Sequence, residues 1–152
     1  MPAPAEKPRL VMKFGGTSVA DLDRIRHAAA RVKREVGRGR DVAVVVSAMA
    51  GRTNELVGLV RETSVLYDAR EYDAVVASGE QVTSGLMALV LQEMGVAARS
   101  WQGWQIPVRT TGAHGAARVE EVGAENLSRK FGEGLHAVIA GFQGIGPDGR
   151  IS

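Results

Sequence analysis

The sequence predicts an α/β protein, a three-layer α/β/α sandwich around a mostly parallel sheet. Strand-like and helix-like segments alternate along the chain in the order strand, helix, strand, two helices, strand, helix, strand. The run Val-Ala-Val-Val-Val at 42–46 is continuous and rich in β-branched residues, which is typical of a strand covered on both faces of a parallel sheet. In such doubly wound folds ligands bind at the carboxyl ends of the strands. The residues that follow each strand are therefore the first candidates for a site.

Composition excludes several classes of protein. Hydrophobic residues at 45% and charged residues at 24% of 152 are ordinary for one globular domain with a sizeable core. A net charge of +2 gives little reason to expect nucleic acid as a partner. The chain has no cysteine, which excludes disulfides and thiolate metal sites and fits a reducing compartment. The apolar runs at 42–46 and 86–91 are too short to span a bilayer, so we expect a cytoplasmic protein without a membrane partner.

The first half of the chain predicts a strand, a helix and a second strand. Residues 10–14 form the first strand, and Ser18 with Asp21 is expected to be the capping pair that starts the helix. Gly37 and Gly39 are expected to end it. Apolar residues at spacings of three and four mark its buried face: Leu22, Ile25, Ala29, Val32 and Val36.

The second half predicts three further helices, two strands and a hairpin turn. One helix is expected at 55–65, and another begins near Glu71 and is capped again at Ser78, with Gln81 in the capping-box position. The residues that continue its buried stripe are Leu86, Leu89 and Val90. Strands are expected at 96–101 and 136–142, a helix at 123–131, and a hairpin turn at 146–149.

The segment Lys13-Phe14-Gly15-Gly16-Thr17-Ser18-Val19 combines the features of a phosphate-binding loop. An apolar strand runs into a lysine and a glycine pair, and a helix is expected to open directly afterwards. Paired glycines let the backbone approach an anion, the N–H groups at a helix start face it, and lysine adds a mobile positive charge. An ordinary strand-to-helix turn with a surface lysine remains an alternative reading of these residues alone.

This segment resembles the opening motif of the aspartate kinases, the aspartokinase branch of the amino acid kinase family. Three further segments agree with the family in order and approximate spacing: Val44-Val45-Val46-Ser47-Ala48-Met49 followed by Thr53-Asn54-Glu55-Leu56, Ala77-Ser78-Gly79-Glu80-Gln81-Val82, and Val138-Ile139-Ala140-Gly141-Phe142-Gln143-Gly144. The resemblance covers nearly the whole chain after residue 8. It implies a flexible terminus at 1–8 and, at 9–152, the amino-acid-binding part of a domain with the amino acid kinase fold.

The resemblance also implies roles for particular residues. Lys13 would be catalytic, stabilising charge on the transferring phosphoryl group, and would hold ATP phosphate together with Phe14, Gly15 and Gly16. L-aspartate would be held by three residues: Ser47, Thr53 and Glu80. From the residues alone, the last three are equally a strand-end hydroxyl, a helix cap and an acidic residue at its own helix N-terminus. Mg²⁺ would be bound through the ATP phosphates, so no protein metal ligands are expected.

The implied activity is ATP-dependent phosphorylation of the aspartate β-carboxylate to 4-phospho-L-aspartate, at the entry to lysine, threonine and methionine biosynthesis. The complete enzyme would be a homodimer. The family continues with a Gly-Arg-Gly-Gly-Ser-Asp motif, adenine- and ribose-binding segments and regulatory ACT domains, so this chain alone is expected to have little or no kinase activity. The alternatives are another relative, such as acetylglutamate or glutamate kinase, and a non-catalytic truncated protein.

Two other patterns do not predict sites. Residues 144–149 match the dinucleotide pattern G-x-G-x-x-G, but Pro147-Asp148-Gly149 favours a turn and no helix can follow before Ser152. The histidines His27, His114 and His136 lack metal-type spacing and are interpreted as helix-face, loop and strand residues.

Overall fold

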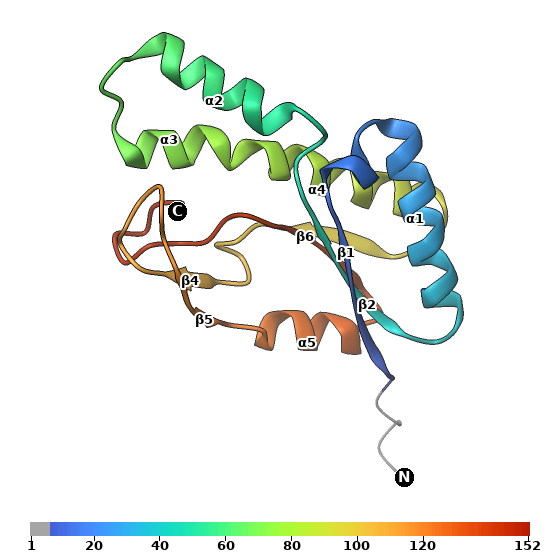
Figure 1. Cartoon of the computed structure of the whole chain (residues 1–152). Coiled ribbons are helices and arrows are strands. Elements are labelled where there is room, and N and C mark those ends of the chain that lie inside the picture. Colours follow the sequence, from blue (N-terminus) through green and yellow to red (C-terminus); the bar gives the residue numbers. More distant parts are fainter. Residues whose placement is uncertain (1–6) are drawn as a thin grey trace.

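A computed structural model describes residues 7–152 of the chain, and the expected flexible terminus lies outside the described residues over 1–6. Its centre is a four-stranded parallel sheet in the order β1-β2-β6-β3 (Figure 1). The strands are β1 (Arg9–Phe14), β2 (Asp41–Val46), β6 (His136–Ala140) and β3 (Ala98–Trp101). The predicted α/β class with a mostly parallel sheet is confirmed, although the last two strands are shorter than the expected 136–142 and 96–101.

The strands end in register, which places the segments that follow them at one edge of the sheet. Phe14 pairs with Val46, and Val46 pairs with Ala140. The N–H of Ser47 then donates to the carbonyl of Phe14 at 3.1 Å, so the first two strand-end loops leave the sheet side by side.

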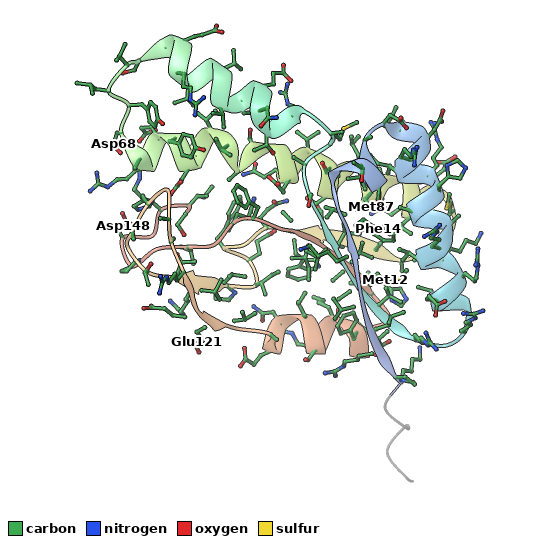
Figure 2. The ribbon with its side chains drawn as sticks, in the orientation of Figure 1. Met12, Phe14, Asp68, Met87, Glu121 and Asp148 are labelled. Carbon is green, nitrogen blue, oxygen red and sulfur yellow. The ribbon has the colours of Figure 1, made fainter. Side chains whose placement is uncertain are left out.

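Helices cover both faces of the sheet. On one face lie α1 (Leu22–Gly37) and α4 (Ser78–Glu93), and Figure 2 shows Phe14 and Met87 in the apolar layer beneath them. On the other face, α5 (Glu125–Gly132) closes a smaller core around Ile106, Leu127, Phe131 and Ala137. The alternation along β2 explains both layers, because Val42, Val44 and Val46 belong to the first core while Ala43 packs against the second.

The start of α1 differs from the prediction. Asp21 is itself the N-cap, and its carboxylate accepts from the N–H of Arg24 at 2.8 Å. Ser18 lies in the short 3-10 turn η1 (Gly16–Val19) and caps nothing, so the expected capping pair is wrong. Leu22 is exposed, whereas Ile25, Ala29 and Val32 are buried as expected.

The helices α3 (Ala69–Val76) and α4 follow one another with a break at Ala77. The expected cap at Ser78 is wrong, because the Ser78 hydroxyl donates backwards to the carbonyl of Val75 at 2.6 Å. Where one helix runs into the next, carbonyls of the first already accept from the N–H groups of the second, and no cap is needed. Leu89 is 61% exposed, so its predicted place in the buried stripe is also wrong.

The segment Ala69–Glu93, 25 residues in all, is long and apolar enough to cross a membrane by length and composition. Half of its apolar window is buried against the rest of the chain, as in the core helix of a globular domain.

The helix α2 (Arg52–Thr63) pairs with α3 and stands beyond the end of the sheet (Figure 1). It begins earlier than the expected residue 55 because Gly51 adopts a left-handed conformation, with φ of 79°, and turns the chain into the helix. It also ends before Val65, which is exposed.

Two strands were not predicted. The pair β4 (Val108–Thr110) and β5 (Val119–Val122) is antiparallel, and all of β5 is exposed. Short strands that carry Glu120 and Glu121 lack the apolar alternation that marks a strand in a sequence. The predicted turn at 146–149 is confirmed by the hydrogen bond from the N–H of Gly149 to the carbonyl of Gly146 at 3.0 Å, with Ile145 bridging to Ile151.

Candidate site at the carboxyl ends of the strands

Ala48, in the loop after β2, is the residue where Gly16, Gly79 and Glu80 meet. A side chain at Gly16 would place its Cβ 3.1 Å from the Ala48 carbonyl oxygen, and one at Gly79 would come within 2.8 Å of the Ala48 Cβ. The N–H of Ala48 donates to Oε1 of Glu80 at 3.0 Å. The two glycines therefore allow the loop after β1 and the first turn of α4 to approach the same residue, Ala48.

Glu80 is a buried carboxyl group with unused hydrogen-bonding capacity. The residue is 3% exposed, and Oε2 has no hydrogen-bond partner among residues 7–152. Burial raises the pKa of Glu80, and the N–H groups of Ala48 and of Glu80 itself offset this only in part. A buried acceptor without a partner is costly, so this oxygen favours a ligand that donates hydrogen bonds, above all a cation. This feature goes beyond the alternative of an acidic residue that merely faces its own helix N-terminus.

The loop after β1 has the openness expected of an anion site but a different local structure. Lys13 is exposed, and the side chain of Phe14 is buried in the core, which leaves only its backbone for a ligand. Gly15 is extended, with φ of −75° and ψ of 170°, and a side chain there would meet nothing within 4 Å. The expected α-helix start is wrong, since η1 follows instead. A 3-10 turn also leaves its first N–H groups unpaired, so the capacity to bind an anion remains.

Ser47 and Thr53 border the same region and are half-buried. The N-cap of α2 is Gly51, so the reading of Thr53 as a helix cap is wrong. Neither hydroxyl makes a hydrogen bond to another group within residues 7–152. Arg52 comes within 3.8 Å of the position of a Gly79 Cβ, which sets the first turn of α2 beside that of α4.

Phe142 is a candidate residue that our sequence reasoning missed. It directly follows Gly141 at the end of β6, it is 74% exposed, and its φ of 57° is left-handed. A bulky residue in that conformation costs about 1–3 kcal/mol and persists only where its surroundings impose it. The sequence predicted it as the last residue of a strand at 136–142, and neither its place beyond the end of β6 nor its left-handed backbone was predicted.

An apolar cavity of about 520 Å³ lies next to the segment after β6. It is bounded by α3, by the segment after β6 and by β4–β5, and its lining includes Tyr72, Val76, Val108, Val119, Ile139 and Phe142. None of the charged or hydroxyl-bearing candidates lines it. We assign the candidate site to the polar group around Ala48 because phosphate and amino acid ligands require charged partners.

The histidines lie elsewhere. His136 is buried in β6, where Nδ1 accepts from the N–H of Val42 at 3.1 Å, and burial lowers its pKa. His114 lies between two carboxylates, with Nδ1 2.9 Å from Asp73 and Nε2 3.2 Å from Asp148. No group of three side chains suited to a metal ion occurs among residues 7–152.

The sheet is parallel, and a glycine-containing loop follows its first strand. This loop and the buried carboxyl group of Glu80 both approach Ala48. These features define a doubly wound domain with a ligand site at the strand ends. The comparison with known families agrees with this class. The chain belongs to the amino acid kinase family, whose model matches residues 8–152.

Several of the similar proteins are aspartokinases. The chain is 44% identical over 143 residues to the aspartokinase of Geobacillus stearothermophilus, covering 94% of this chain and 35% of that protein. The aspartate kinase structure from Synechocystis superposes with a TM-score of 0.74 at 41% identity, over 89% of this chain and 22% of the other. Aspartokinase III of E. coli, in complex with aspartate and ADP, superposes with a TM-score of 0.82 at 26% identity, over 96% and 43%. The chain thus spans about a third of the length of the curated relatives it matches.

Proposed function

We propose that this chain forms the amino-acid-binding part of an ATP-dependent aspartate kinase. The proposal rests on the buried Oε2 of Glu80, which lacks a hydrogen-bond partner among the described residues. The other carboxylate oxygen of Glu80 binds the N–H of Ala48, and the loop that contains Gly16 approaches the carbonyl of the same residue. The names of the similar proteins, and the aspartate and ADP bound in the E. coli relative, favour aspartate as the amino acid and ATP as the phosphoryl donor.

In this proposal each candidate residue has one task. Glu80 pairs with the α-ammonium group of aspartate, and the hydroxyls of Ser47 and Thr53 donate to its carboxylates. Lys13 places a positive charge on the transferring phosphoryl group, while the backbone of Gly15 and Gly16 admits the phosphates. These residues fit the triphosphate of ATP, since Gly15 leaves open space and Lys13 is exposed. Magnesium is carried by those phosphates.

The chemistry needs no protein nucleophile. An oxygen of the aspartate β-carboxylate attacks the γ-phosphorus, the bond to the bridging oxygen breaks, and ADP leaves as 4-phospho-L-aspartate forms. Positioning and charge stabilisation account for most of the catalysis of such transfers. The product enters lysine, threonine and methionine biosynthesis, and we place the enzyme in the cytoplasm as a homodimer.

The test is hydroxylamine trapping of the acyl phosphate with MgATP, on the protein expressed from its complete reading frame. Aspartate, glutamate and N-acetylglutamate are compared as acceptors, and the 152-residue chain is assayed in parallel. We expect hydroxamate from aspartate alone, and little or none from the shorter chain.

The other outcomes reject the proposal in distinct ways. Hydroxamate only from glutamate or acetylglutamate would assign the chain to another branch of the family. No hydroxamate from folded protein, together with no binding of aspartate by calorimetry, would favour a non-catalytic protein.

A further inference from the structure

Gln143 links three segments that are far apart in the sequence. Its side chain is buried, and the residue is 8% exposed. Nε2 donates to the carbonyl of Ala77 at 3.1 Å, and Oε1 accepts from the N–H of Gly103 at 2.9 Å. The contact with Gly103 is close, because a Cβ there would lie 2.7 Å from the carbonyl oxygen of Gln143.

The carbonyl that Gln143 binds lies at the break between α3 and α4. Breaks in a helix occur where a side chain or water takes over a backbone group of the helical ladder. Here Gln143 binds the carbonyl of Ala77, and the Ser78 hydroxyl binds that of Val75. The break precedes Gly79 and Glu80, so its geometry sets the direction in which the first turn of α4 meets Ala48.

Gln143 also lies next to a strained residue. It directly follows Phe142, whose left-handed φ must be imposed by its surroundings. Both functional groups of the Gln143 side-chain amide are hydrogen-bonded, so the residue after Phe142 is itself fixed to two other segments.

We propose that Gln143 is a positioning residue for the amino acid site: by holding the helix break at Ala77, it sets the carboxyl group of Glu80 against the peptide of Ala48. Gln143 acts through Glu80 and has no contact with the ligand in this proposal. The inference rests on the proposed function only where it concerns substrate affinity, since the geometry of Glu80 can be measured without any ligand.

The two functional groups of the amide can be separated by substitution. Gln143→Glu keeps an oxygen that accepts from Gly103 but loses the donor to Ala77, and Gln143→Met loses both. The matched control is Gln92→Met at the far end of α4, because Gln92 also donates from Nε2 to a carbonyl, that of Ala98, at 2.9 Å.

The first measurement is hydrogen–deuterium exchange at the peptide that contains Ala48, on the protein from its complete reading frame without ligand. If Gln143 positions Glu80, both Gln143 variants lose protection at the Ala48 N–H by about tenfold or more, the loss expected when a hydrogen bond to a carboxylate is broken, while Gln92→Met stays like the wild type. Unchanged protection at Ala48 in the folded Gln143→Glu variant would overturn the inference.

The second measurement separates affinity from turnover in the hydroxamate assay. We expect the KM for aspartate to rise about tenfold in Gln143→Glu with kcat and the KM for ATP nearly unchanged, as for the loss of uniform binding. An equal loss of kcat in Gln143→Glu and Gln92→Met would indicate a merely structural role and overturn it. If the wild type makes no hydroxamate, the proposed function fails, and the exchange experiment alone decides the inference.

Discussion

At the scale of a single residue, Glu80 combines two opposing properties. Its burial destabilises the ionised form, whereas Oε2, which has no hydrogen-bond partner among residues 7–152, suits it to a cationic ligand. Functional sites commonly retain such groups at the expense of stability.

The substitution Glu80→Gln tests this balance. The amide oxygen can still accept from the N–H of Ala48, but an NH₂ group replaces the oxygen that would bind the ammonium ion. We expect aspartate affinity to fall about 10–100-fold, the range for a charged hydrogen bond, as measured by calorimetry. Because the pKa of Glu80 is raised in the folded protein, the wild type loses stability as pH rises through that pKa and the carboxyl group ionises. The variant has no such group, so in urea unfolding at pH ~8 it should be at least as stable as the wild type. A variant that binds aspartate normally would refute the role of Glu80.

Lys13 allows a separate prediction, because it is exposed near the end of β1, whereas Glu80 is buried in the first turn of α4. In the protein from the complete reading frame, Lys13→Met should lower kcat about 100–1000-fold, as the loss of one group that stabilises transition-state charge does. Aspartate affinity should stay unchanged in the same samples. A parallel loss of affinity would instead assign Lys13 to amino acid binding.

At the scale of elements, the close approach of α4 to the loop after β2 depends on Gly79. A methyl group there would collide with the Cβ of Ala48, whereas Gly85 in the same helix has nothing within 4 Å of the equivalent position. Gly79 is therefore required for close packing, whereas Gly85 only lowers the helix propensity of α4.

The pair of substitutions Gly79→Ala and Gly85→Ala measures this difference. Gly79→Ala should lower the free energy of unfolding by about 1–3 kcal/mol through overpacking. Gly85→Ala should raise it by about 0.4–1 kcal/mol, because alanine loses less conformational entropy in a helix. Urea denaturation of both variants checks this, and equal effects of the same sign would contradict the packing argument.

At the scale of the whole molecule, His114 joins three separate parts of the chain. Asp73 belongs to α3, Asp148 to the C-terminal hairpin turn, and Figure 2 shows Asp148 below the start of α3 near Asp68. Further charged groups cross the same junction: Arg70 lies 4.0 Å from Asp148, and Arg150 pairs with Glu71. The N–H of Gly115 also donates to Asp73. The hydrogen bond to Asp73 raises the pKa of His114; burial opposes this in part, and Asp148 raises the pKa further.

A pH dependence of stability follows with a definite sign. Because the folded pKa of His114 is raised, the folded state binds more protons, and the stabilisation is complete below the unfolded pKa of about 6.5 and is lost as pH rises through the folded value. The difference in unfolding free energy between wild type and His114→Gln should therefore shrink from pH ~6 to pH ~9. His136 contributes the opposite slope, but it is common to both proteins and cancels in the difference. A difference independent of pH would show that folding does not shift the pKa of His114.

Local periodicity and backbone preferences were enough to predict the parallel α/β class, the strand at 42–46, the helix that ends near Gly37 and the turn at 146–149. Two features became known only from the folded chain: Asp21 and not Ser18 caps α1, and β4 pairs with β5.

The assembly of the candidate site also belongs to the tertiary structure. The motifs indicated Lys13, Ser47, Thr53 and Glu80, but not that the last would meet Ala48 across 32 positions, or that Gln143 would reach Ala77 across 66. Local patterns specify which side of an element is apolar. They do not specify which peptide that element will touch, because such contacts form only when segments distant in the chain pack together against one core.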